Sequence, residues 1–216
     1  MGCKCLVMEL SRLIEVALQF LYELNSYAKR GGIKKYMFKY GLYIALNHID
    51  GFSEDLKSLL RGVKWFDIFN AILDKLIKED CVLVDAGGDD RGLLKPSYGC
   101  TERAEALWEK LSERDREVLK CVAEFVSKAS WRELQLYTCK VYGLCEDPDI
   151  ARVLKWRRVY AMRMRRKGLI SIGLAAEIAG LSTLEFIEYL KKRGVKPFEV
   201  EESDVMKELE YVEKML

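Results

Sequence analysis

The chain has 216 residues, half of them hydrophobic, which is enough apolar material for two small folded cores and excludes a disordered chain. Charged residues make up 32% of the chain but sum to only +2, so the overall charge indicates no particular partner. No apolar run approaches the length of about 18 residues that a membrane span needs, and we expect a cytoplasmic protein without a signal peptide or membrane contact.

Side-chain amides are scarce, because the sequence has only three Asn and two Gln. Together with abundant Lys, Arg and Glu, this scarcity is typical of hyperthermophiles, and we expect a thermophilic archaeal source. Disulfides persist inside such cells, and two pairs are conceivable, Cys81 with Cys100 and Cys139 with Cys145. We expect no cofactor and no metal site, since there is one His and no CxxC pair.

Helical periodicity predicts four helices in the first 78 residues, over 6–29, 33–49, 53–60 and 65–78. A β-hairpin follows, with strands at 81–84 and 93–98 on either side of a turn rich in Gly and Asp. Thr101 is the predicted cap of a helix through Leu111. The order of these elements over residues 33–111 resembles that of winged helix-turn-helix regulators, a local order that many folds share.

Capping signals predict three more helices before residue 170. Ser112 with Asp115 opens a helix that runs to Ser127, and Ser130 forms a capping box with Glu133 at the start of a helix over 131–142. Residues 147–149, Asp-Pro-Asp, open a helix of about twenty residues that ends at Gly168.

The last of these helices is strongly basic, with eight Lys and Arg and no acidic residue between 151 and 167. At about 100° per residue, its cations lie opposite an apolar face, and Arg157 is the misfit that falls in that face. The predicted apolar face consists of Ile150, Val153, Leu154, Tyr160, Ala161 and Met164. Such a basic stripe can follow phosphates, or it can be a solvated face that pairs with the seven carboxylates of residues 199–213.

Residues 169–195, LISIGLAAEIAGLSTLEFIEYLKKRGV, have the pattern of a helix-turn-helix. Ser171 caps the first predicted helix, Gly180 adopts the positive φ of the turn, and Ser182 caps the second, which ends at Gly194. Small residues permit a close crossing and larger ones form a shared core. The small residues are Ala175, Ala176 and Ala179, and the larger ones are Leu181, Phe186, Ile187 and Leu190. The alternative is an amphipathic helical hairpin of another kind.

This region resembles the short helix-turn-helix antitoxin family of prokaryotes over about residues 160–216. The pattern G-x-I-S-x-G-x-A-A-E-x-A-G-L-S-x-x-E-F begins at Gly168 and is followed by a helix, by Arg193 and Gly194, and by an acidic segment. The resemblance implies the antitoxin half of a toxin–antitoxin pair, beside a PIN-domain ribonuclease toxin. Members are usually only the short module, so the module can equally have been recruited into a larger regulator.

Both predicted recognition helices have acidic outer faces. The second helix of the 169–195 motif exposes Thr183, Glu185, Glu188, Lys191 and Lys192, and the helix over 65–78 exposes Asp67, Asn70 and Asp74. Phosphates repel carboxylates, although Glu can accept a hydrogen bond from cytosine N4. We therefore expect the basic helix, with Lys191, Lys192 and Arg193, to make most of any DNA contact.

We predict a mainly α protein with a winged-helix-like domain containing one β-hairpin (1–111), a helical connector that includes the basic helix (112–167), and a helix-turn-helix module with an acidic tail (168–216). The predicted function is a dimeric, DNA-binding transcriptional regulator and not an enzyme. The alternative is an antitoxin-like module that neutralises a small toxin protein. The aspartate and glycine cluster over 85–90 lacks the spacing of a calcium loop and is interpreted as a solvated turn.

The candidate site residues fall into three groups. Double-stranded DNA is expected to contact Arg152, Lys155, Arg158, Arg163, Arg166, Lys167, Lys191 and Lys192. The helix-turn-helix core is expected from Ala176, Gly180, Leu181 and Phe186, and partner contacts from Glu201, Glu202, Asp204 and Glu208.

Overall fold

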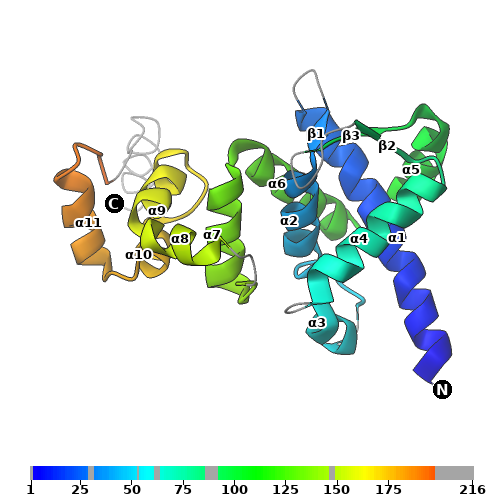
Figure 1. Cartoon of the computed structure of the whole chain (residues 1–216), viewed down its shortest axis with the longest axis horizontal. Coiled ribbons are helices and arrows are strands. Elements are labelled where there is room, and N and C mark those ends of the chain that lie inside the picture. Colours follow the sequence, from blue (N-terminus) through cyan, green and yellow to red (C-terminus); the bar gives the residue numbers. More distant parts are fainter. Residues whose placement is uncertain are drawn as a thin grey trace, which may run out of the picture.

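The computed structural model describes residues 2–28, 32–52, 54–60, 64–85, 92–145 and 149–197. Over these residues the protein is mainly helical and has one small sheet (Figure 1). The helices are α1 (Gly2–Tyr27), α2 (Lys35–Leu46), α3 (Glu54–Leu60), α4 (Lys64–Lys78), the 3-10 turn η2 (Tyr98–Cys100), α5 (Thr101–Lys110), α6 (Glu113–Lys128), α7 (Trp131–Tyr142), α8 (Ile150–Lys155), α9 (Arg157–Arg166), α10 (Ile172–Ala179) and α11 (Thr183–Lys191). The strands are β1 (Ile33–Lys34), β2 (Val82–Asp85) and β3 (Leu93–Pro96). Among the described helices, none has both the length and the apolar character that a membrane crossing demands.

The first hydrophobic core is built around α1, which packs against α2, α4, α5 and α6. Aromatic side chains fill it, and Trp65, Tyr43 and Phe20 are each fully buried. Burial of such side chains stabilises a fold by roughly 1.5–3 kcal/mol each. The predicted connector of residues 112–167 was expected to begin with α6, but the apolar face of α6 lies in this first core.

The sheet contains a strand that the sequence pattern did not predict. β1 pairs antiparallel with β3 through Ile33 opposite Leu94 and Lys34 opposite Leu93, and β2 pairs with the other edge of β3. The strand order is therefore β1-β3-β2. The prediction of a helix over 33–49 was wrong at its first two residues, because Ile33 and Lys34 form β1. Ile33 is fully buried where it pairs with β3. The predicted hairpin is confirmed, and its turn over residues 86–91 lies outside the described residues.

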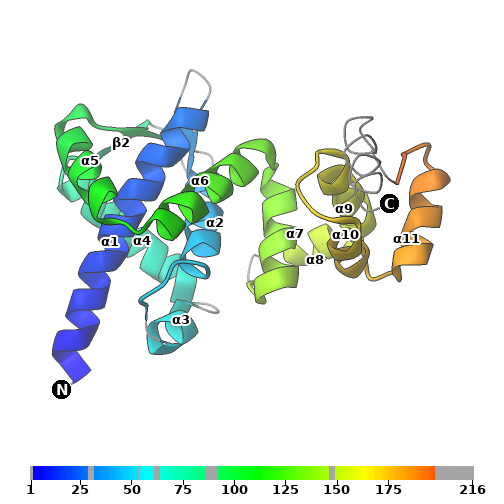
Figure 2. The same ribbon diagram turned by 180° about the vertical axis from the view of Figure 1, so that it is seen from behind.

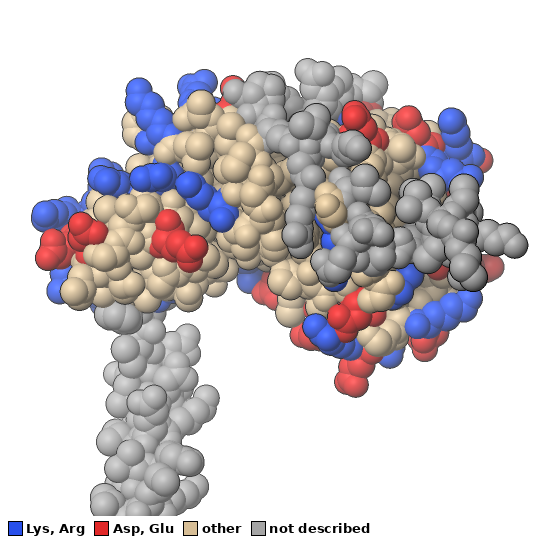
Figure 3. Space-filling model, turned by 90° about the horizontal axis from the view of Figure 1, so that it is seen from below, with Lys and Arg blue, Asp and Glu red and all other residues tan. Residues whose placement is uncertain are grey.

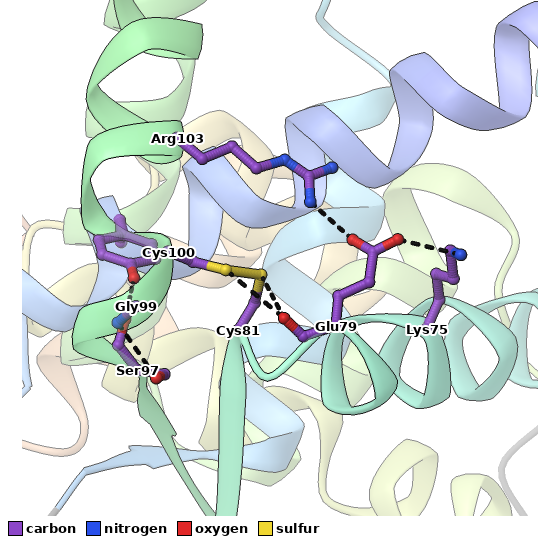
Figure 4. The surroundings of a disulfide bond; sticks show 8 residues. Lys75, Glu79, Cys81, Ser97, Gly99, Cys100 and Arg103 are labelled. Atoms are coloured by element: carbon purple, nitrogen blue, oxygen red, sulfur yellow. Dashed lines mark hydrogen bonds and ion pairs between the residues drawn. A yellow bond between two sulfur atoms is a disulfide. The ribbon is translucent and has the colours of Figure 1, made fainter.

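Both conceivable cysteine pairs are disulfide bonds in the structure. Cys81 is joined to Cys100, with Cα atoms 5.2 Å apart, and this bond ties the chain before β2 to the start of α5 (Figure 4). Beside it, Glu79 accepts from Arg103 at 2.7 Å and pairs with Lys75 at 3.0 Å. Cys139 is joined to Cys145 at the end of α7, and Cys121 is an exposed free cysteine.

The cap predicted at the start of α5 was wrong. Thr101 is the first helical residue, Cys100 occupies the N-cap position without a side-chain hydrogen bond, and Ser97 caps η2 by accepting from the Gly99 amide. The short 3-10 turn before α5 takes the place that an ordinary N-cap would have. The predicted caps at Ser112 and Ser130 are confirmed, since Ser112 accepts from the Asp115 amide and Ser130 forms a capping box with Glu133.

A second core is formed by α7 to α11 at the other end of the molecule, and Figures 1 and 2 show the two ends joined through α7. Leu134 of α7 lies in the first core and Leu136 lies in the second. The residues predicted as a connector are thus divided between two cores, with α6 in the first and α8 and α9 in the second. The physical reason is that each of these helices has an apolar face that only packing against a core removes from water.

Candidate nucleic-acid interface

The turn between α10 and α11 is built by local signals. Ser171 accepts from the Leu174 amide at 3.2 Å and caps α10, which ends at Gly180 with φ of 68°. Ser182 then caps α11 through a capping box with Glu185. These three features confirm the predicted start, turn and second start of the helix pair. A positive φ suits Gly180 because glycine has no Cβ to clash in that conformation.

Helices α10 and α11 meet through small side chains. Ala175, Ala176 and Ala179 are at most 2% exposed, and Phe186 and Leu190 of α11 are fully buried beside them. Helix α9 packs on α10, so three consecutive helices share this core. Leu181 and Ile187 are only half-buried. The predicted small-residue crossing is therefore present in the structure.

The basic segment is two helices and not the single helix expected from the sequence. Trp156 separates α8 from α9 with φ of −102° and ψ of 14°, and its amide bonds to the Val153 carbonyl three residues back. The break lets α8 pack on α7 while α9 packs on both α7 and α10. The predicted start at residues 147–148 lies outside the described residues, and α8 begins after Asp149. The predicted apolar face is buried or half-buried throughout.

All eight cations predicted to contact DNA are exposed, and seven of them have no ion-pair partner among the described carboxylates. These seven are Arg152, Lys155, Arg158, Arg163, Arg166, Lys191 and Lys192, and we call them the basic set. Residues 149–197 carry twelve Lys and Arg against four Asp and Glu, a net charge of +8 in a chain whose total is +2. Figure 3 shows Lys and Arg side chains gathered at this end of the molecule.

The eighth predicted cation, Lys167, is used inside the fold. Its Nζ donates to the Glu133 carboxylate at 2.6 Å and to the Lys128 carbonyl at 3.1 Å. Glu133 is 1% exposed and also accepts from the Ser130 amide, so the pair compensates a buried charge. Lys167 is therefore less available to a phosphate than the members of the basic set, because its charge is already paired with Glu133.

Arg157, the misfit of the helical projection, also has a structural role. It is half-buried, and its guanidinium lies over Gly180, in the space that a Cβ at that position would occupy. A cation at the end of α10 also suits the negative end of the helix dipole. This contact brings the first turn of α9 next to the turn between α10 and α11.

The outer face of α11 differs in two ways from the expected acidic face. The Glu185 carboxylate accepts from both the amide and the hydroxyl of Ser182, at 2.8 Å each, and these hydrogen bonds lower the Glu185 pKa. Leu184, which was not among the residues predicted for this face, is 75% exposed. Helical spacing could have predicted this exposure, because Leu184 does not lie on the face of α11 that carries the buried Phe186 and Leu190. Trp156, 52% exposed, is the other large exposed apolar side chain that the structure describes in α8 to α11.

Other predicted features have different outcomes. The partner-binding carboxylates Glu201, Glu202, Asp204 and Glu208 lie outside the described residues. In the first half, Asp67, Asn70 and Asp74 of α4 are exposed as expected, so this helix presents an acidic face. Within the described ranges, no group of three or more His, Cys, Asp and Glu is placed to hold a metal ion.

In a comparison with known proteins, a protein-family model matches this same C-terminal region, and two relatives match part of the chain. The model of an uncharacterised protein family, UPF0175, matches residues 149–214. A UPF0175 protein of Aeropyrum pernix is 38% identical over 55 residues, which are 26% of this chain and 61% of that protein. A UPF0175 protein of Archaeoglobus fulgidus is 33% identical over 75 residues, which are 32% of this chain and 85% of that protein.

No solved structure matches the chain. The match to the family model spans α8 to α11, which are the helices that carry the basic set. The chain covers most of the Archaeoglobus relative at 33% identity. Through residues 149–214, this chain belongs to the UPF0175 family.

Proposed function

We propose that this protein is a DNA-binding transcriptional regulator and that α8 to α11 bind the duplex. One observation carries the proposal: the basic set is exposed around a helix-turn-helix-like pair and has no ion-pair partner among the described carboxylates. Exposed cations of this kind bind phosphates because each contact releases condensed counterions from DNA. The arrangement favours a backbone-binding surface over a solvated face of mixed charge.

The helix pair supplies the second part of the argument. In helix-turn-helix proteins the second helix enters the major groove and the first crosses the backbone. Here α11 has one side buried against α10 and the other side open, so it is free to enter a groove. Such proteins usually read paired half-sites as dimers, and we propose that this one does so.

For the first half, we propose a winged-helix-like arrangement that makes few DNA contacts. Its strand order is β1-β3-β2, and α4 packs against β2 immediately before the hairpin. That order of elements supports the resemblance to winged helix-turn-helix regulators. The resemblance concerns the fold and does not by itself indicate DNA binding. The exposed Asp67 and Asp74 on α4 would be repelled by phosphates, so the charge favours DNA binding at the other end of the molecule.

The test is fluorescence anisotropy of the full chain with its own upstream DNA and with an unrelated duplex, from about 50 to 200 mM salt. We expect affinity to fall steeply with salt, and the double variant Arg163→Gln, Arg166→Gln to lower the slope of log K against log salt by about 0.9 per lost phosphate contact. The matched control is Lys140→Gln, which removes an exposed charge on α7 outside the basic set. Absence of binding to either duplex at about 50 mM salt rejects the proposal.

An antitoxin-like module is the second candidate function. It is favoured by the sequence of residues 198–216, which contains seven carboxylates and two lysines and could bind a basic partner. The test is co-expression with the product of the neighbouring gene, followed by size-exclusion chromatography. A stable complex that is lost when Glu201, Glu202, Asp204 and Glu208 are changed to Gln or Asn supports this candidate, and separate elution of the two proteins removes it.

A further inference from the structure

Helix α11 exposes a stripe that combines one apolar, one acidic and one basic side chain. Leu184, Glu188 and Lys191 are exposed and follow one another at helical spacing, with Leu184 75% exposed in the first turn. Phe186 and Leu190, on the other side of the helix, are fully buried. Leu184 therefore contributes nothing to the core, and its apolar surface is available to a ligand.

The neighbours of this stripe are basic side chains and a glutamate that is held by hydrogen bonds. Arg158 lies close enough to Glu185 for its charge to act on that carboxyl, and Lys191 and Lys192 lie at the opposite end of α11. Glu185 itself is held in the capping box by Ser182 and does not reach outward as a free acid. The helix thus has basic groups near both ends and an apolar side chain in its first turn.

We propose that Leu184 reads thymine in the major groove by packing on its C5 methyl group. This inference rests on the proposed DNA-binding function and names the base that the site recognises. Residues in the N-terminal part of a recognition helix are those that reach base edges, and the thymine methyl is the apolar group that the major groove displays. Cations at the two ends of α11 fix its register on the backbone, while Leu184 supplies sequence discrimination.

The experiment compares thymine with uracil, which differ only by that methyl group. The full chain selects its preferred duplexes from a random 30-base-pair pool, and the selected pool is copied once with dTTP and once with dUTP. Wild-type protein should bind the thymine form more tightly by about fourfold for each methyl group contacted. The variant Leu184→Ala should bind both forms equally, with an affinity close to that of the wild type for the uracil form.

Two further variants keep the result interpretable. Leu184→Met retains an apolar side chain and should keep most of the preference for thymine, and Val141→Ala, a truncation on the surface of α7, should keep all of it. Chemical denaturation should show the wild-type midpoint for all of them, since Leu184 is not part of the core. Equal affinity of wild type for both forms, or a thymine preference that survives in Leu184→Ala, overturns the inference while DNA binding stands. Absence of binding to any duplex rejects the proposed function as well.

Discussion

Nζ of Lys167 lies 2.6 Å from the carboxylate of Glu133, so one ion pair joins the end of α9 to the first turn of α7. Glu133 is 1% exposed and the Lys167 side chain is 37% exposed. A buried carboxylate that loses its partner is destabilising, and the partial exposure of the lysine reduces the effect.

We expect Lys167→Ala to lower the free energy of unfolding by about 2 kcal/mol. The measurement is urea denaturation of the full chain, with Lys140→Ala as the exposed control on α7. DNA affinity should change less in Lys167→Ala than in Arg163→Ala, because Lys167 is already paired. Equal stability of the two lysine variants would contradict the structural role of this pair.

Gly180→Ala should destabilise the second core more than Gly168→Ala does. Both glycines have positive φ, 68° and 70°, but an added Cβ at Gly180 meets the Arg157 guanidinium whereas at Gly168 it meets nothing within 4 Å. Backbone strain alone costs about 1 kcal/mol in each case, and displacement of Arg157 adds to it at Gly180. Denaturation monitored by tryptophan fluorescence measures both, and identical losses would show that Arg157 moves without cost.

Removal of the Cys81–Cys100 disulfide should destabilise the first core. The bond closes a loop with a sequence separation of 19 residues, for which chain-entropy arguments give about 3 kcal/mol. The variant Cys81→Ala, Cys100→Ala is compared with Cys121→Ala, which removes an exposed free thiol. Thermal unfolding should show a large loss for the double variant and almost none for the control. A double variant as stable as the wild type would show that the bond adds nothing to the paired strands.

The capping box of α11 predicts a dependence of stability on pH. The amide and hydroxyl of Ser182 lower the pKa of Glu185 below its ordinary value of 4.5. A lowered folded-state pKa contributes stability that is complete above the ordinary value and is lost as pH falls through the lowered one. In Glu185→Gln, stability should therefore fall less between about pH 5 and pH 3 than in the wild type. A parallel pH profile for the two proteins would remove the capping box as a source of this dependence.

Local signals in the sequence predicted much of the second core. Ser171, Gly180 and Ser182 each act through hydrogen bonds or backbone angles within a few residues, so their positions in the sequence suffice to locate the turn. The Ser130–Glu133 capping box and the hairpin after α4 were predicted for the same reason. The exposed cations of α8 and α9 also followed from helical spacing, even though the two helices were expected to be one.

Features that depend on distant residues were not predicted. β1 exists because Ile33 meets β3, which is far along the chain, and no local pattern marks two extended residues before a helix. The break at Trp156 reflects packing on α7 and α10, and the assignment of α6 to the first core reflects packing on α1 and α2. Helical spacing places Lys167 beside Arg163 and Arg166, and only its contact with Glu133 distinguishes it from them.

The sequence by itself determined where helices begin and turn, and which segment concentrates positive charge, because caps, glycine conformations and helical periodicity are short-range properties. The tertiary structure decided which of those charges remain open to solvent, which are neutralised, and that Leu184 faces outward on α11. Exposure and pairing depend on which surfaces meet when the two cores pack, and that is set by contacts between residues that are far apart in the chain.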